Sequence, residues 1–430
     1  MKKTTKFLFG LCLTGFLIQN PVSAQDIKPR PSTLHKILLE SEKFPKKDLV
    51  LKSYKSQPFP DKYIDFGLSG NSFDPKKIVI TEADRVAAGK ATGKMAGLGK
   101  AMASSASGGM IDSTAGDLQL QIDKYLKENK VAKQIGAKWL DIQNGQAQLG
   151  NYMTTRALDG ISEAEKSTID MDTYKANILK NDFELMANSF VTINKLFFQE
   201  NEPVARLVRD LAKAEAAKIT IPIAQVKAMQ LADTIYEKTK VGYTVLATTY
   251  LYQLDWSAEK ANLANDYFNN KNIDAAKAFD TTTLFNLIFL GKEVSTSLVT
   301  FSLKETRTED QIIELAVKRS LNNTMAKLQR KYSVFRPIFP LLNANPFTAQ
   351  IGLKEGVDNG DKFDVLKPEP GKIKGTYVWN KVGSLSVDKK TVVWDNDSES
   401  AESLAVAEKF TLLTGKGKGL STNCYIRLAD

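Results

Sequence analysis

The sequence predicts an α+β fold in which helices pack on a small, mostly antiparallel sheet, followed by a small SH3-like β-barrel. Three observations predict it. Apolar residues recur at helical spacing through much of residues 114–340, a few stretches there are dense in β-branched and aromatic residues, and the helical signal nearly ends before residues 345–430. We therefore expect an α+β domain over 114–340 and a barrel domain over 345–430.

The first 24 residues have the three parts of a secretory signal peptide. Three lysines form a positive start, residues 7–18 form an apolar core, and Val22-Ser23-Ala24 offers a small-residue cleavage site. The apolar core is too short to span a membrane, and no later stretch reaches the roughly 18 apolar residues that a span needs. We expect cleavage near Ala24, no transmembrane span, and a mature chain that is periplasmic, secreted or outer-membrane-associated.

The segment after the signal peptide is rich in proline and lysine, and we expect residues 25–85 to be partly ordered. Residues 86–113 form a Gly/Ala/Ser-rich connector. Its glycines fit neither phosphate loop, because Met95 stands where a P-loop has Ser or Thr and Met102 stands where a dinucleotide loop has its third glycine. A small-residue helix packed on protein and a membrane-active helix are the alternatives.

Helical periodicity predicts four helices in the first part of the α+β domain. They are expected over residues 117–140, 171–188, 203–217 and 222–240. Strands are predicted over residues 189–198, 243–256, 284–290 and 294–303, with the last two turning at Gly291. Thr308 and Gln311 then form a capping box, which predicts the start of a helix that continues to about Tyr332.

The C-terminal region reads as short strands separated by turns. Strands are predicted over residues 347–352, 362–366, 376–387, 390–395, 410–415 and 424–428, and a helical insert over residues 398–410. GVDNGD, residues 356–361, is a strong turn signal between the first two strands.

Charge and residue scarcity restrict the function. The formal net charge of +10 falls by the three signal-peptide lysines, 10 − 3 = +7, for the mature form. This excess favours anionic glycans or lipid headgroups as partners, and the basic residues are too scattered to indicate nucleic acid. His35 is the one histidine and Cys424 the one cysteine beyond the signal peptide. Zinc sites and His- or Cys-based catalysis are therefore not expected, and no cofactor is predicted.

Two resemblances extend the prediction. Gly352, Gly356, Gly360 and Asp361, followed by Phe363 and Val365, resemble the turn-and-strand pattern in the small C-terminal barrel of flagellar H-ring-type assembly proteins. Over residues 115–400 the chain also resembles a family of exported proteins of Gram-negative anaerobes. That family has no assigned activity, so the resemblance implies the domain organisation and no catalytic residue.

A few residues are candidates for sites. Asp395, Asp397 and Glu399 alternate along WDNDSES and are weak candidates for a calcium site, with a solvated acidic loop as the alternative. Ser113, in Asp112-Ser113-Thr114, is a candidate for O-glycosylation. The four tryptophans suit either sugar stacking or the core, and the latter is favoured for two of them, Trp139 and Trp256.

The leading functional hypothesis is an exported, non-enzymatic envelope protein that acts as an assembly or interaction module. Other envelope proteins are then the expected partners, and an oligomer is compatible with it. The first alternative is a binder of anionic glycan or lipid headgroups. The second is a hydrolase that uses paired carboxylates or a Ser-Lys arrangement.

Overall fold

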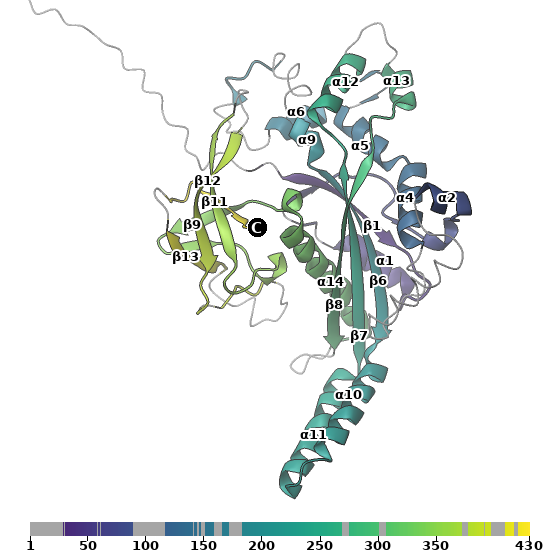
Figure 1. Cartoon of the computed structure of the whole chain (residues 1–430), viewed down its shortest axis with the longest axis vertical. Coiled ribbons are helices and arrows are strands. Elements are labelled where there is room, and N and C mark those ends of the chain that lie inside the picture. The colour runs from purple at the N-terminus through teal and green to yellow at the C-terminus, as the bar shows by residue number, and fades with distance from the viewer. Residues whose placement is uncertain are drawn as a thin grey trace, which may run out of the picture.

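The computed structural model describes residues 29, 31–57, 59–60, 62–88, 117–140, 142–143, 146–147, 151–158, 166–171, 183–268, 275–300, 307–371, 377–390, 392–396, 409–416 and 420–430. They form a mixed α+β arrangement. A sheet has helices on both faces, a closed β-barrel lies beside it, and a helical hairpin projects from one end of the sheet (Figure 1).

The sheet has strand order β2-β1-β6-β7-β8, with β3 also paired to β1. Its strands are β1 (Ser32–Leu39), β2 (Tyr63–Asp65), β3 (Ser72–Phe73), β6 (Ser189–Glu200), β7 (Gly242–Leu254) and β8 (Leu287–Thr300). β6, β7 and β8 are antiparallel, whereas β1 runs parallel to β2, β3 and β6. The expectation of a mostly antiparallel sheet therefore holds for one half of it only.

β1 corrects the predicted domain boundary. We expected residues 25–85 to lie outside the α+β domain and to be partly ordered, yet Ser32–Leu39 is an interior strand between β2 and β6. Leu34, Ile37 and Leu38 are fully buried, because helices or strands cover both faces of β1 at these positions. The sheet domain therefore begins near residue 32.

Helices cover the two faces of the sheet. On one face lie α1 (Lys47–Ser56) and α14 (Glu309–Lys331), which pack on Leu196 and Phe198 of β6. On the other lie α4 (Leu118–Glu128), α5 (Val131–Leu140), α6 (Asn151–Leu158), α9 (Phe183–Ala187), α12 (Ala258–Phe268) and α13 (Ala275–Thr281), with the short pair β4 (Ile142–Gln143) and β5 (Gln146–Ala147). Alternate residues of β6 thus enter two separate cores.

Several predicted helices are confirmed and one is divided. The capping box of Thr308 and Gln311 begins α14 as predicted. The single helix expected over residues 117–140 is two helices, α4 and α5, because Lys130 adopts a φ of 50° between them. The second predicted helix, 171–188, is described mainly at Phe183–Ala187, and the rest of it lies outside the described residues.

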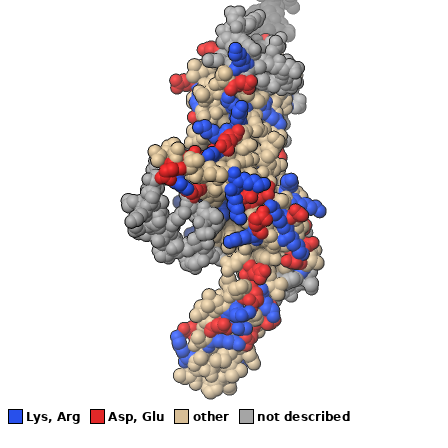
Figure 2. Space-filling model, turned by 90° about the vertical axis from the view of Figure 1, so that its right-hand side faces the viewer, with Lys and Arg blue, Asp and Glu red and all other residues tan. Residues whose placement is uncertain are grey.

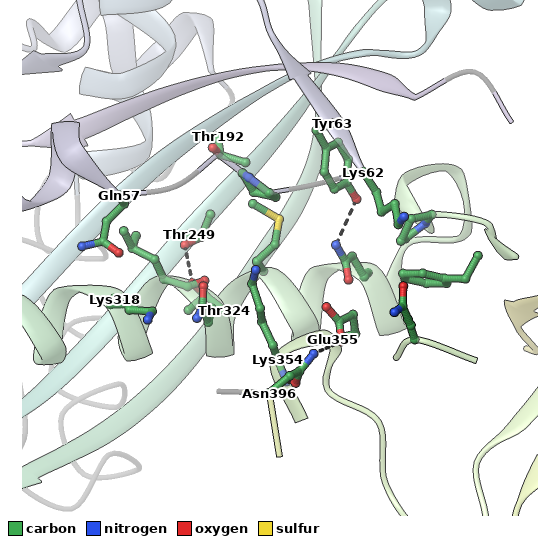
Figure 3. Close-up of a pocket in the computed structure, with 18 of the residues that line it drawn as sticks. Gln57, Lys62, Tyr63, Thr192, Thr249, Lys318, Thr324, Lys354, Glu355 and Asn396 are labelled. Atoms are coloured by element: carbon green, nitrogen blue, oxygen red, sulfur yellow. Dashed lines mark hydrogen bonds between the residues drawn. The ribbon is translucent and has the colours of Figure 1, made fainter. Parts of the chain in front are cut away.

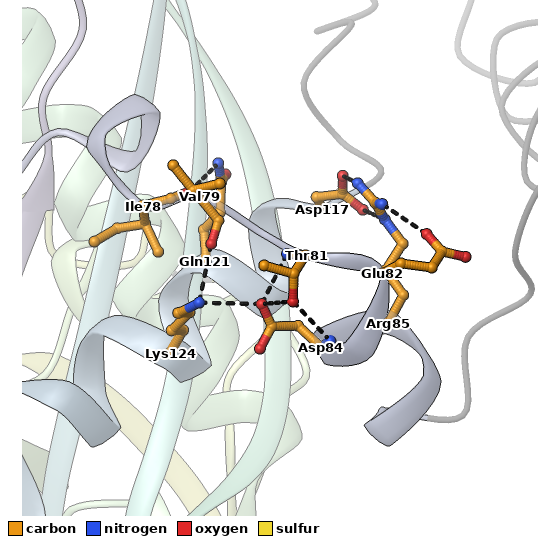
Figure 4. A network of polar contacts seen from close by, with 9 residues as sticks. All are labelled: Ile78, Val79, Thr81, Glu82, Asp84, Arg85, Asp117, Gln121 and Lys124. Carbon is orange, nitrogen blue, oxygen red and sulfur yellow. Dashed lines mark hydrogen bonds and ion pairs between the residues drawn. The ribbon is translucent and has the colours of Figure 1, made fainter.

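A polar network attaches the short helix α2 (Glu82–Ala87) to α4 (Figure 4). Thr81 and Asp84 form a capping box, and Asp84 also pairs with Lys124 on α4 at 3.0 Å. Arg85 pairs with Asp117 at 2.7 Å. Hydrogen bonds from the backbone and hydroxyl of Thr81, and then from Lys124, lower the pKa of Asp84 to about 2. The network fixes α2 and the preceding turn η2 (Pro75–Lys77) against the helical layer.

β8 corrects the prediction of two strands that turn at Gly291. It is one strand, and its register with β7 shifts by one residue between Leu251 and Tyr252. Gly291 has a φ of 151° at this bulge, and a Cβ there would lie 2.0 Å from Oη of Tyr332. Glycine is therefore required for a bulge and a close approach to a side chain.

The projecting hairpin consists of α10 (Asn201–Ala216) and α11 (Pro222–Thr239), close to the predicted bounds. It continues directly from the ends of β6 and β7 and extends away from the rest of the chain (Figure 1). Among the described helices, none combines the length and the apolar character that a membrane crossing requires.

The barrel is closed, with strand order β10-β13-β12-β11-β14-β9, and every pairing is antiparallel. Its strands are β9 (Phe339–Ala344), β10 (Phe347–Ala349), β11 (Lys362–Pro370), β12 (Tyr377–Val387), β13 (Thr411–Lys416) and β14 (Tyr425–Leu428), with the 3-10 turns η3 (Ser333–Phe335) and η4 (Leu353–Glu355). Cys424 is buried inside it, as its apolar context suggested.

The expected start of the barrel and one of its predicted strands differ from the structure. The barrel begins with β9, whereas we expected it to begin at residue 345. The expected strand over residues 390–395 is not formed where the structure describes it, since residues 392–396 are not in a strand. The predicted helical insert, 398–410, lies outside the described residues except at its last two positions.

Candidate functional site

The predicted turn motif connects the barrel to helix α14. Arg330 of α14 donates hydrogen bonds to both carboxylate oxygens of Asp361, at 2.6 and 2.9 Å, and to the carbonyl of Gly356 at 2.7 Å. Hydrogen bonding to Asp361 raises the pKa of the guanidinium. Gly356 has a φ of 70°, and a Cβ there would lie 2.7 Å from Cβ of Ala326 on α14. The motif is therefore the joint between the two domains.

Gly352 and η4 also position the segment around Trp394. A Cβ at Gly352 would lie 2.2 Å from the carbonyl oxygen of Trp394. Glu355 accepts hydrogen bonds from the Gly352 N–H at 2.8 Å and from Nδ2 of Asn396 at 2.7 Å. The Leu353 N–H donates to the Trp394 carbonyl at 3.0 Å. These bonds hold residues 394–396 against the start of the barrel.

A cavity of about 490 Å³ lies between the joint and the sheet (Figure 3). Residues of β1, β6 and β7 line it on the sheet side, α14 forms a second side, and the barrel forms a third. Its volume is within the range of small-molecule sites, and such sites often lie at domain interfaces. Figure 3 shows Lys318 and Thr324 on α14 and Lys354, Glu355 and Asn396 on the barrel side of this space.

The lining carries an excess of positive charge. Five lysines contribute to it, namely Lys36, Lys62, Lys318, Lys354 and Lys409. Two carboxylates do so, Glu355 and Asp395, and Glu355 already accepts the two hydrogen bonds described above. Such a balance favours an anion over a cation.

Lys36 is a partly buried lysine of the lining, on strand β1. Burial lowers the pKa of its ammonium group, although Asp65 opposes the shift. Its Nζ lies 4.6 Å from the centroid of the Phe59 ring, and Nζ of Lys62 lies 5.6 Å from that of Phe339. An anion in the cavity would compensate for the water that Lys36 has lost.

The side of the cavity formed by the sheet and α14 is polar and held by hydrogen bonds. Thr249 donates to Asn194 and Thr324 is within hydrogen-bond distance of the Thr249 hydroxyl, both at 2.9 Å, and Asn194 donates to Tyr54 at 2.8 Å. Near the joint, Tyr63 donates to the Phe335 carbonyl at 2.6 Å. Because these groups are buried and bonded to one another, they form a fixed surface for a ligand.

The structure separates the site residues predicted from the sequence. Asp395 is exposed and lies at the cavity, whereas Asp397, Glu399 and Ser113 lie outside the described residues. Among the residues that the structure describes, no group of His, Cys, Asp and Glu is placed to hold a metal ion. Gly360, the remaining glycine of the turn motif, has a φ of 85°, and a Cβ there would lie 3.1 Å from Cε of Lys389.

The tryptophans divide between core and cavity. Trp139 and Trp256 are buried in the core, as favoured from the sequence, and Trp379 packs edge-on against Tyr425. Trp394 lines the cavity. The five lysines could not be predicted as a group from the sequence, because they are spread from residue 36 to residue 409 and no local pattern connects them.

In comparisons with known proteins, no family model matches the chain, and no curated protein matches it.

Proposed function

We propose that this protein is an exported, non-enzymatic interaction module whose interdomain cavity binds an anionic ligand. The observation that carries the proposal is the charge of the lining: five lysines and two carboxylates surround a space of about 490 Å³. We expect the partly buried Lys36 to contribute most to the binding free energy, because a charge pair in a poorly solvated place is less screened than one at the surface.

The ligand class that fits best is an acidic carbohydrate. Trp394 lines the cavity and has an aromatic ring of the kind on which a sugar ring stacks. Gln57, Asn322 and Gln350 line the same cavity, and their amides can bond to hydroxyl groups. The lysines would pair with a carboxylate or sulfate on the sugar. This develops the hypothesis of an anionic glycan binder that the net charge suggested.

Binding of acidic and neutral oligosaccharides by calorimetry tests the proposal. We expect Lys36→Gln with Lys318→Gln to lower the affinity for the acidic ligand at least about tenfold, since two charge pairs are lost. Trp394→Ala should lower the affinity for acidic and neutral sugars to the same extent. The matched control is Lys76→Gln with Lys77→Gln, on the exposed turn η2 far from the cavity lining.

Two results would contradict this function. One is a cavity variant that binds the acidic sugar as tightly as the control variant. The other is retention of acidic and neutral sugars to the same extent by the unchanged protein at low salt, where charge pairs are strongest.

The wider assignments from the sequence remain proposals. We propose that the barrel is of the SH3-like kind and that the chain belongs with the exported proteins it resembles. Association with other envelope proteins would be tested by crosslinking and capture of the mature chain from envelope fractions. Capture of this chain alone would contradict it.

A further inference from the structure

The far end of the α10–α11 hairpin exposes three isoleucines. Ile219, Ile221 and Ile223 are 36%, 64% and 72% exposed, and we call residues 219–223 the apolar tip. Figure 2 shows mainly uncharged surface at this end of the projection, with charged side chains concentrated nearer the sheet. The apolar tip is thus an aliphatic surface at the end of the hairpin that points away from the sheet (Figure 1).

The fold does not need these side chains. α10 and α11 bury small residues, Ala205, Ala216 and Ala232, whereas large aliphatic residues such as Leu207 and Leu211 are each 60% exposed. Exposed apolar surface of this extent contributes little to the stability of the hairpin and is typical of a surface that contacts another molecule.

The charges around the apolar tip indicate what covers it. Residues 216–232 contain two charged side chains, Lys218 and Lys227, and Glu215 at the edge of this segment pairs with Lys218 at 2.6 Å. The segment therefore carries the positive charge of Lys227 beside an exposed ion pair. A second copy docked by the same surface would bring Lys227 towards its own copy, since a two-fold interface pairs each patch with itself. A surface with an apolar interior and an anionic boundary is complementary both to the isoleucines and to the positive charge beside them.

We propose that the apolar tip inserts into the headgroup region of a phospholipid bilayer that carries anionic lipids. The isoleucines enter the boundary with the acyl chains, and Lys218 and Lys227 lie among the phosphates. The sixteen residues of α10 span about 24 Å, so the sheet and the barrel stand off the membrane. This inference is independent of the cavity, since no residue of α10, of α11 or of the turn between them lines it.

Vesicle flotation of the purified mature chain tests it. The probes are vesicles of phosphatidylcholine with phosphatidylglycerol and vesicles of phosphatidylcholine alone. We expect the protein to float with the anionic vesicles and less with the neutral ones. The triple variant Ile219→Ser, Ile221→Ser, Ile223→Ser should lower the affinity at least about tenfold.

Two control variants change the same number of exposed side chains elsewhere on the protein. Val79→Ser, Val86→Ser, Val392→Ser removes three aliphatic side chains that are 72%, 65% and 90% exposed elsewhere, and it should float as the unchanged chain does. Lys218→Glu with Lys227→Glu should weaken flotation, whereas Lys76→Glu with Lys77→Glu on η2 should do so much less.

A second measurement places the tip in the bilayer. The variant Ile221→Cys is labelled with a polarity-sensitive dye, for which buried Cys424 does not compete. The emission of the dye should shift to the blue on addition of anionic vesicles. Quenching groups in the acyl chains should lower its fluorescence. No flotation, or equal flotation of the tip variant and its control, would overturn the proposal. So would a dimer in the absence of vesicles that the tip variant dissociates, which would make the apolar tip a protein interface.

Discussion

His35 shows how one buried residue can make stability depend on pH. It lies in β1, is 2% exposed, and burial lowers its pKa from 6.5 to about 4, although Asp65 and the Gly70 backbone raise it. The imidazole is therefore neutral in the folded chain at a pH where the unfolded chain binds a proton. The unfolded state binds more protons between these two values, so stability is present above pH 6.5 and is lost as the pH falls towards 4.

We expect His35 to account for a loss of at most about 3 kcal/mol across that interval. The measurement is urea unfolding at a series of pH values for the wild type and for His35→Gln, which cannot take up the proton. Carboxylates contribute to both curves, so the difference between the two proteins isolates the histidine. Parallel curves from pH 6.5 to pH 4 would refute this account of its burial.

At the scale of elements, Gly291 connects backbone geometry to the packing of α14. Gly291→Ala should destabilise the fold by about 2–4 kcal/mol, because it combines a disfavoured φ with a collision against Tyr332. Chemical unfolding would measure the cost. In a Tyr332→Ala background the collision is absent and the backbone part remains, so a double-mutant cycle separates the two.

A matched glycine is available for comparison. Gly67 also has a positive φ, of 62°, but a Cβ there would meet nothing closer than Nζ of Lys138 at 3.5 Å. Gly67→Ala should therefore cost about 1 kcal/mol, the backbone effect alone. If Gly291→Ala cost no more than Gly67→Ala, the bulge would not need glycine for the reason given.

The elements that the sequence predicted correctly carry local signals. α14 has a capping box, β7 is dense in Thr, Tyr, Val and Leu, and Pro222 starts α11. β1 was missed because its partners are distant: Leu34 pairs with Phe190 of β6, and the polar residues His35 and Lys36 obscure its pattern. β9 was missed because two prolines flank and interrupt it. The cavity was unpredictable for the same reason as β1, since its lysines meet only in the folded chain.

At the scale of the whole molecule, the Arg330–Asp361 pair is expected to decide whether the two domains act as one unit. The carboxylate is largely shielded, with 12% exposure of the Asp361 side chain, and the guanidinium also bonds the Gly356 carbonyl. A bidentate, partly buried pair of this kind resists replacement by lysine, whose single ammonium cannot bond both oxygens and the carbonyl in the same plane.

Arg330→Met should therefore loosen the barrel from α14 and lower the stability by about 1.5–3 kcal/mol, with Arg330→Lys in between. Hydrogen exchange would report it as faster exchange in η4 and in the last turns of α14. The matched control is Lys331→Met on the same turn, where the ammonium is 58% exposed and its pair with Glu293 is worth little.

The variant Arg330→Met also tests whether the contact between the two domains affects binding of the proposed ligand. Because α14 and the barrel form different sides of the cavity, a loosened joint leaves Lys318 and Lys354 without a fixed separation. Affinity for the acidic sugar should then fall in Arg330→Met, although neither residue of the pair would touch it, and the entropy cost of ordering the site on binding should rise. Unchanged affinity together with faster exchange in η4 would show that the ligand binds on one domain alone. Unchanged exchange would show that contacts other than this ion pair hold the domains together.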